Sequence, residues 1–336
     1  MKLLTITVPC YNSQEYMEKC LNSLLPEKER IEIIVIDDGS TDDTGKIADH
    51  YAQMYPDTVS VIHQENGGHG EGINQGLKHA SGIYFKVVDS DDTLSEDFSL
   101  FLDTLEDVEN HGGVDLFVTN YYYVHADGKG DRSINYSNAL PEKEIFLWNK
   151  IRRFKLHQLL TIHSCTFRTE LMRKTNVTLP KHLFYEDNYM ICGNLRDVKT
   201  MYYLNKDLYL YNIGRADQSV QESVMKKRYK HQLAVAEYCF KSIRLDDIQD
   251  KKKFQYLKHE MFMMFAIGIV FTRLNKSDET DADIKTMWDN CREYDPKWTD
   301  YFQKKTALAL IDIPGKAGMA FTNWVYHTAN KIVRFN

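Results

Sequence analysis

An acidic turn at residues 85–94 has the residue types and spacing of a site for a divalent cation. The segment reads FKVVDSDDTL, an apolar run typical of a buried strand that is followed at once by Asp89, Asp91 and Asp92. Like charges so close together raise one another's pKa unless a positive group lies among them. Mg²⁺ sites commonly combine one or two carboxylates with the phosphate oxygens of a ligand. We therefore expect Asp89 and Asp91 to bind a divalent cation, and the alternative is a turn that caps a helix.

Two further polar motifs follow strand-like segments. VIDDGSTDDT at residues 35–44 places Asp37 and Asp38 where a carboxylate can accept hydrogen bonds from a ribose or a base N–H, or where an aspartate caps a helix in a solvated turn. ENGGHGEGINQG at residues 65–76 holds five glycines, which suits a backbone that must approach another group closely. This second segment does not match GxxxxGK[ST], so it is not a P-loop.

Another acidic motif lies further along the chain. FYEDNYM at residues 184–190 places Glu186 and Asp187 among aromatic and apolar side chains. Such surroundings raise the pKa of a carboxylate by desolvation, which suits a general base. The alternative is a helix start, where acids lie at the positive end of the helix dipole. YNIGRADQS at residues 211–219 then offers Arg215 and Ser219 as ligands for a diphosphate, or only an exposed arginine.

The twelve histidines show no HxxxH or HExxH spacing, so a zinc protease is not indicated. His69, His163 and His182 lie near the motifs. Each is more often structural or in contact with an acceptor than a metal ligand, although one of them could complete the shell of a cation.

The elements that must position these motifs alternate between strand and helix. Through the first eighty residues such segments succeed one another at 3–8, 13–25, 31–36, 41–55 and 58–64, and a helix that ends at residue 79 follows the glycine-rich residues 66–72. This order predicts an α/β fold, a Rossmann-like and mostly parallel sheet with helices on both faces. Ligands bind beyond the carboxyl ends of such strands, so we expect the motifs to converge at one edge. The sequence becomes helical after residue 220, and we place a boundary there between residues 1–220 and 221–336.

Composition excludes several classes of protein. Lys and Arg number 42 against 48 Asp and Glu, a net charge of −6, so no global basic field favours nucleic acid as a partner. The six cysteines include no CxxC pair and suggest reduced thiols in a cytoplasmic protein. The N-terminus reaches proline too early for a signal peptide, and the most apolar later run, residues 261–271, is shorter than the ~20 residues of a transmembrane helix.

Taken in order, the motifs over residues 1–220 resemble those of family 2 glycosyltransferases with a GT-A fold. The acidic turn after residue 88 resembles the DxD motif of that family, and FYEDNYM resembles its ED motif. The resemblance implies an inverting, metal-dependent enzyme that moves a sugar from a UDP-sugar to an acceptor hydroxyl. It implies a role in making bacterial cell-surface polysaccharide, teichoic acid or glycoconjugate, with a saccharide, a lipid-linked glycan or a protein-linked glycan as acceptor. Two alternatives remain. DSDDTL also matches the DxDxT pattern of haloacid-dehalogenase-like phosphatases, with Asp89 as nucleophile, although that motif usually follows the first strand of its domain; the other is a non-catalytic binding module on the same scaffold.

The resemblance also assigns roles to individual residues. The residues that it implies for binding the uridine are Pro9, Cys10, Tyr11, Asp38 and Asn66. Asp89 and Asp91 are the DxD pair, and Asp91 is the direct ligand of Mn²⁺ or Mg²⁺. Asp187 is the catalytic base with Glu186 as its neighbour, and Arg215 and Ser219 contact the diphosphate. Many members carry an arginine before the asparagine that matches Asn74, whereas this chain has Ile73.

The C-terminal segment, residues 304–336, carries five Lys or Arg against one acid, together with several aromatic residues. A basic amphipathic helix of this kind can lie on an anionic membrane surface. We therefore expect a cytoplasmic enzyme with peripheral contact to the inner face of the plasma membrane. The alternative is a helix packed on the protein or on a second subunit of a homo-oligomer.

Overall fold

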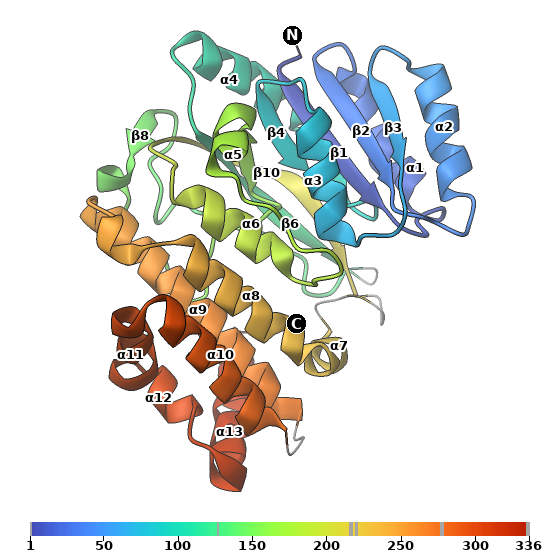
Figure 1. The fold of residues 1–336 in the computed structure, drawn as a ribbon. Helices are drawn as coiled ribbons and strands as arrows, with labels where there is room; N and C mark the ends of the chain where they lie inside the picture. Colours follow the sequence, from blue (N-terminus) through green and yellow to red (C-terminus); the bar gives the residue numbers. More distant parts are fainter. Residues whose placement is uncertain (1, 126–127, 215–217, 219–220, 276–278, 334–336) are drawn as a thin grey trace. The chain divides into compact units, whose positions relative to one another are not determined.

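The structure is a computed structural model that describes residues 2–125, 128–214, 218, 221–275 and 279–333, with side chains up to residue 328. The chain forms two compact units, residues 1–183 with 197–214 and residues 184–196 with 215–336. The sequence predicts one boundary near residue 220, whereas the helix that carries Glu186 and Asp187 packs with α8 (Tyr229–Ser242) in the second unit. Figure 1 shows the elements of both units.

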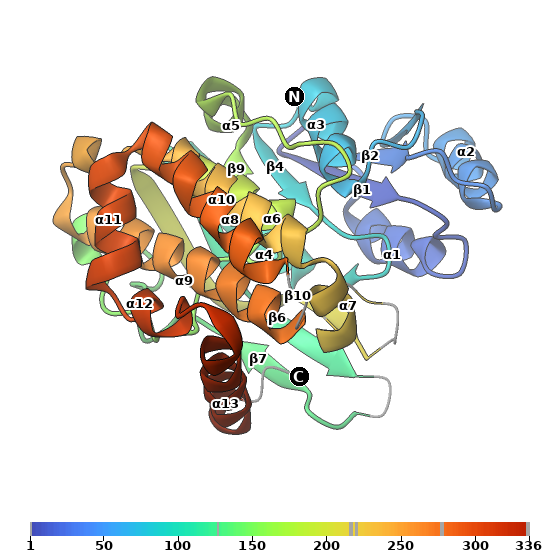
Figure 2. The same ribbon diagram turned by 60° about the horizontal axis from the view of Figure 1, so that its bottom comes forward.

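The first unit is built on one sheet. Its described strands are β1 (Leu4–Cys10), β2 (Ile31–Asp37), β3 (Val59–His63), β4 (Tyr84–Val87), β5 (Thr93–Leu94), β6 (Leu116–His125), β7 (Arg132–Ile134), β8 (Ile145–Leu147), β9 (Cys165–Arg168) and β10 (Thr200–Ile213). The strand order is β3-β2-β1-β4-β9-β6-β10-β5. β3, β2, β1 and β4 are parallel neighbours, as are β6 and β10, whereas β9 runs antiparallel to β4 and β6. β7 pairs with β6, which Figure 2 shows, and β8 pairs with β10. The predicted mostly parallel α/β sheet is confirmed.

Two helices of this unit cover one face of the sheet. The described helices of the unit are α1 (Met17–Leu24), α2 (Thr44–Met54), α3 (His69–His79), α4 (Phe98–Asn110) and α5 (Thr169–Thr175). Because side chains alternate between the two faces of a strand, Leu4, Ile6 and Val8 of β1 point to the same side. They share one buried cluster with Met17 of α1 and Phe101 of α4. This cluster is the core on which the first unit is built.

α3 packs against β1 on the opposite face of the sheet (Figure 1). Thr7 points to this face, and a Cβ atom at Gly76 would collide with the Thr7 hydroxyl. A Cβ atom at Gly72 would come within 3.1 Å of Pro9. The helix can therefore lie this close to the strand because these positions are glycine, which accounts for two of the five glycines at residues 65–76.

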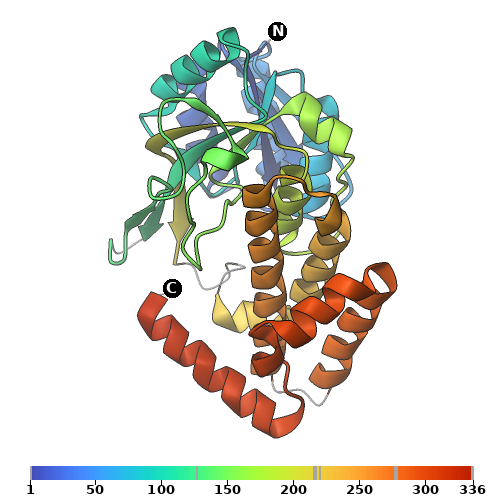
Figure 3. The ribbon, with the colours of Figure 1, turned by 90° about the vertical axis from the view of Figure 1, so that its left-hand side faces the viewer.

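The second unit is helical in its described residues. Its helices are α6 (Glu186–Leu195), α7 (Glu222–Lys227), α8 (Tyr229–Ser242), α9 (Lys251–Asn275), α10 (Thr280–Tyr294), α11 (Pro296–Lys305), α12 (Leu308–Ile311) and α13 (Gly315–Val333). Figure 3 shows the long helix α9 beside α8 and α10. The rings of Phe240, Phe265, Trp288 and Phe302 pack together between these helices. Within the described residues, no helix combines the length and apolar character that crossing a bilayer requires.

Candidate functional site

The polar segments after β1, β2, β3 and β4 share one edge of the sheet in the first unit, as the sequence predicts. β1, β2 and β3 end in register, since Cys10 lies opposite Asp37 and Asp37 lies opposite His63. The Oγ atoms of Ser13 and Ser90 are 2.8 Å apart and join the segment after β1 to the acidic turn after β4. Ligand-binding residues on these four segments can therefore act on one bound molecule.

Asp38 holds the glycine-rich segment in place. Its carboxylate accepts hydrogen bonds from the backbone N–H groups of Gly67 and Gly68, both at 2.8 Å, and from Nε2 of Gln64 at 2.6 Å. Gly68 has a φ of 85°, a conformation that glycine adopts without strain. The side chain of Asp38 is only 3% exposed. This carboxylate therefore fixes the loop that begins α3, and its contact with a ribose or a base stays a prediction.

The other residues predicted to bind uridine differ in which of their groups a ligand can reach. Pro9 and Cys10 are buried, and the Cys10 thiol donates a hydrogen bond to the Val8 carbonyl at 3.5 Å, so Cys10 can offer a ligand only its backbone. Burial raises the pKa of the Cys10 thiol, which keeps it protonated. Tyr11 is 54% exposed. Asn66 is exposed too, and its side chain donates to the Asp38 carbonyl at 2.9 Å.

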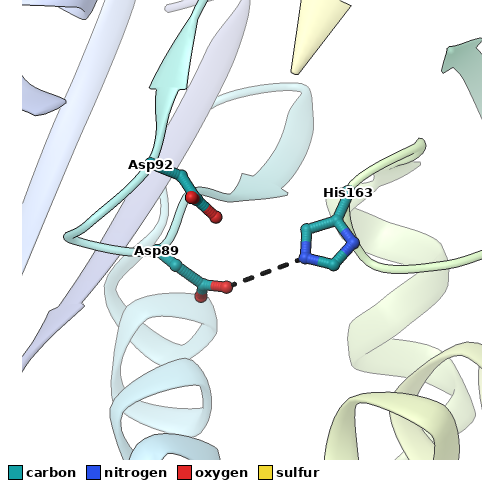
Figure 4. A group of neighbouring side chains, drawn as sticks. All are labelled: Asp89, Asp92 and His163. Atoms are coloured by element: carbon teal, nitrogen blue, oxygen red, sulfur yellow. Dashed lines mark ion pairs between the residues drawn. The ribbon is translucent and has the colours of Figure 1, made fainter. Parts of the chain in front are cut away.

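The acidic turn brings Asp89 together with a residue far along the chain. Ligand atoms of Asp89, Asp92 and His163 all lie within 4.8 Å of one another. Figure 4 shows these three side chains. His163 Nε2 is 3.9 Å from Asp89 Oδ2, and His69 Nε2 is 2.9 Å from Asp89 Oδ1. Asp91, the predicted direct ligand, is half-buried, and its backbone carbonyl accepts from Asn212 Nδ2 at 2.8 Å.

Asp92 has a structural role that the sequence analysis missed. Both of its oxygens accept hydrogen bonds, from the Tyr209 hydroxyl at 2.7 Å and from the Asn212 N–H at 2.8 Å. The side chain is fully buried, and burial together with Asp89 and Asp91 raises the pKa of Asp92 well above its usual range. Asp92 thus joins the acidic turn to β10. The third acid of DSDD is the only sequence signal for this role, because nothing marks Tyr209 or Asn212 as its partners.

Lys86 and His163 are buried next to this turn. Lys86 Nζ donates to the His163 carbonyl at 2.9 Å, and its ammonium lies 5.4 Å from the centre of the Tyr209 ring. Burial lowers the pKa of Lys86 to about 8 and that of His163 to about 4. His163 is therefore neutral near pH 7 and has a lone pair to offer a cation. Its Nδ1 atom is buried without a hydrogen-bond partner among the described residues.

These residues fit a hard divalent cation. Carboxylate oxygens suit Mg²⁺ and Mn²⁺, and a neutral imidazole is a common additional ligand of transition metals. Asp89 and His163 point toward one another (Figure 4). Asp91 follows Asp89 by two residues in the same turn. Asp92 is a poorer ligand because both its oxygens are already engaged. His163 was one of three histidines near the motifs, and its sequence context alone did not single it out.

The FYEDNYM motif forms the start of α6 in the second unit. Tyr185 precedes the helix with a φ of 68°, and Glu186 and Asp187 occupy its first turn. Glu186 is 2% exposed and Asp187 is half-buried. Asn188 Nδ2 donates to Asp187 Oδ1 at 3.1 Å. The acids therefore lie at the positive end of a helix dipole. Predicted diphosphate ligands Arg215 and Ser219 lie outside the described residues.

Comparison with known families and proteins gives consistent matches. A family model described as glycosyl transferase family 2 matches residues 5–175. Glycosyltransferase GlyA of Streptococcus pneumoniae is 29% identical over 243 residues, which cover 69% of this chain and 33% of GlyA. Glycosyltransferase GlyG of the same organism is 38% identical over 130 residues, or 38% of this chain and 42% of GlyG. The chain thus matches less than half the length of these two relatives.

One further relative is similar in both sequence and structure. TarS of Staphylococcus aureus, a poly(ribitol-phosphate) β-N-acetylglucosaminyltransferase, is 30% identical over 190 residues, or 54% of this chain and 30% of TarS. The structure of TarS residues 1–349 with UDP superposes with a TM-score of 0.65 and 21% identity, over 98% of this chain and 92% of that one. The mannosyltransferase PcManGT of Pyrobaculum calidifontis, solved with GDP-Man and Mn²⁺, gives a TM-score of 0.53 and 14% identity over 95% of this chain and 85% of that one. These two likenesses concern the fold.

Proposed function

The chain belongs to glycosyl transferase family 2, and on that premise we propose that it is an inverting glycosyltransferase that moves a sugar from a UDP-sugar to an acceptor hydroxyl. One observation carries the proposal: Asp89 and Asp91 lie at the sheet edge where Asp38 and the glycine-rich segment also lie. TarS, whose structures include UDP and UDP-GlcNAc complexes, supports a UDP-sugar as donor. The family match does not favour the phosphatase or the non-catalytic module.

Most of the proposed donor contacts lie in the first unit. The exposed ring of Tyr11, the Asn66 side chain and the backbone at Cys10 would contact the uridine at the shared sheet edge. Asp89 and Asp91, the predicted DxD pair, would hold the cation. His163, which lies in one group with Asp89 and Asp92, would complete its shell. A bound Mn²⁺ or Mg²⁺ would neutralise the charge that develops on the departing diphosphate. Arg215 and Ser219 remain our proposed contacts to that diphosphate.

The acceptor side of the reaction would use the start of α6. Asp187 would accept the proton of the acceptor hydroxyl as that oxygen attacks the anomeric carbon from the face opposite UDP. The new glycosidic bond forms as the bond to the diphosphate breaks, and UDP leaves with the bonding electrons. Glu186, buried next to Asp187, would line the acceptor site. The relatives support a product at the cell surface, such as a polysaccharide, a teichoic acid or a glycoconjugate.

Two substitutions test these assignments with UDP calorimetry and a panel of UDP-sugars. Asp187→Asn should bind UDP as the wild type does and lose transfer by roughly 100-fold or more. Asp91→Asn should weaken UDP binding in the presence of Mn²⁺ by roughly ten-fold and change metal-free binding little. Asp43→Asn, an exposed acid in the same unit, is the control. Near-normal turnover of Asp187→Asn would refute the base, and a wild type that neither binds UDP nor hydrolyses any donor would refute the function.

We also propose that residues 304–336 contact an anionic membrane surface at the inner face of the plasma membrane. Trp324 of α13 is 63% exposed, and Leu310 and Ile313 are exposed near it in the sequence. Another side of α13 packs on the protein, since the Tyr326 hydroxyl donates to Glu222 at 3.1 Å. Flotation with anionic vesicles should therefore recover the wild type and less of Trp324→Ala. Equal recovery would favour packing or a homo-oligomer, which light scattering detects.

A further inference from the structure

Arg228, between α7 and α8, lies over an aromatic ring at the start of the acidic motif. Its guanidinium carbon lies 3.5 Å from the centre of the Phe184 ring. Phe184 also packs edge-on against His231, with 5.3 Å between the ring centres. Its backbone N–H donates to His231 Nδ1 at 3.3 Å. A guanidinium in contact with an aromatic face still has N–H groups in its own plane that can bind an oxyanion with two parallel hydrogen bonds.

Two lysines close to Arg228 in the sequence have carboxylate partners. Lys226 pairs with Glu222, and Lys230 lies 3.5 Å from both Glu279 and Asp283. No ion pair joins Arg228 to a carboxylate among the described residues, although it is half-buried. A half-buried cation that is fixed in place and lacks a carboxylate partner is suited to an external anion.

The position of Arg228 places such an anion near the base. Phe184 precedes Asp187 by three residues, so their Cα atoms are at most about 11 Å apart. Burial and the nearby Arg228 lower the pKa of His231, so this imidazole is neutral near pH 7 and leaves Arg228 as the positive charge. A sugar or polyol whose hydroxyl reaches Asp187 could place a neighbouring charged group on the guanidinium.

We propose that Arg228 is a specificity-determining residue that binds an oxyanion of the acceptor, so that the enzyme glycosylates an anionic chain rather than a neutral one. The inference rests on the proposed function, which assigns Asp187 to the acceptor. A phosphodiester and a carboxylate present the same pair of oxygens to the guanidinium. The test therefore has separate arms for the two.

The experiment measures binding of three oligomers to the full chain in the presence of UDP and Mn²⁺: a glycerol phosphate hexamer, a galacturonic acid hexamer and a neutral glucose hexamer. The wild type should bind at least one anionic hexamer more tightly than the neutral one. Arg228→Met keeps an apolar side chain over Phe184 and removes the charge, and it should weaken that binding by roughly ten-fold to a hundred-fold. Lys227→Met, an exposed neighbour, makes the same change in net charge and should alter binding less than roughly two-fold.

Three outcomes would contradict the proposal. Equal weakening by Lys227→Met would indicate a general charge effect, and no weakening by Arg228→Met would remove Arg228 from the site. Loss of UDP affinity in Arg228→Met would assign the guanidinium to the donor's diphosphate. If Arg228→Met does not fold, Arg228→Lys provides the test. This variant keeps the positive charge but cannot donate two parallel hydrogen bonds from one planar group, so it should still weaken binding of the anionic hexamer. A wild type that binds the anionic hexamer through Arg228 without binding UDP would leave the anion site intact and refute the proposed function instead.

Discussion

Two buried carboxylates, one in each unit, differ in the hydrogen bonds that they accept. Asp38 follows a strand and accepts hydrogen bonds from two loop N–H groups and one side chain. Glu260 lies within α9, is 2% exposed, and its Oε2 atom has no partner among the described residues. Backbone N–H groups inside a helix already bond within the helix, whereas those of a loop remain available. A buried acid after a strand can therefore be satisfied by the backbone, and one in the middle of a helix needs side-chain donors.

The largest expected effect on stability comes from replacing Asp38, the carboxylate that accepts three hydrogen bonds. Asp38→Asn keeps the shape of the side chain but turns an amide N–H₂ toward at least one of its three donors. We expect the free energy of unfolding to fall by roughly 3–4 kcal/mol, because buried donors lose their acceptor. Urea unfolding measures this change. Asp43→Asn, at an exposed acid that pairs with Lys46, should change stability by less than about 0.5 kcal/mol. Equal effects of the two substitutions would show that Asp38 does not hold the loop.

A change at Glu260 should have a smaller effect and the opposite sign. Burial raises the pKa of Glu260 from 4.5 to about 8. Below pH 4.5 both states carry the proton, and between pH 4.5 and 8 only the folded protein keeps it. The free energy of unfolding of the wild type should therefore fall as pH rises through this window. Glu260→Gln should remove that fall and be more stable than the wild type at pH 8 by roughly 2–3 kcal/mol.

The control for this pH profile is Glu293→Gln, an exposed acid on α10. Its urea midpoints should follow those of the wild type from pH 4.5 to pH 8. If the Glu260→Gln profile keeps the wild-type slope, other groups account for the pH dependence, and Glu260 finds donors when it ionises. That result would remove the contrast with Asp38.

The same contrast explains what the sequence could predict. The strands of the parallel half, the shared edge and the acids at Asp38 and Asp89 follow from local patterns, because an apolar run and the turn after it are contiguous in the chain. Glu260 lies in a helical run without a motif, and no local pattern marks it. The hydrogen bonds from Tyr209 and Asn212 to Asp92 span about 120 residues and depend on where β10 lies in the sheet. The proximity of His163 to Asp89 likewise depends on the packing of a loop 74 residues away.

The smallest predicted effect concerns an amide that bonds to a backbone across the first unit. Asn74 of α3 donates to the Leu179 carbonyl at 2.9 Å and accepts from the Leu179 N–H at 3.0 Å, and this pair holds the segment before the acidic motif on α3. Asn74→Ala should lower the free energy of unfolding by roughly 1–2 kcal/mol. The next residue provides a control: among the described residues, the Gln75 side chain bonds to Glu71 one turn away on the same helix, at 2.9 Å, so Gln75→Ala should cost no more than about 0.5 kcal/mol. Because the two substitutions remove amides from adjacent positions of one helix, helix propensity affects both similarly, and the difference between their urea midpoints reports the long-range pair. Equal midpoints would mean that water replaces the Leu179 contacts at no cost.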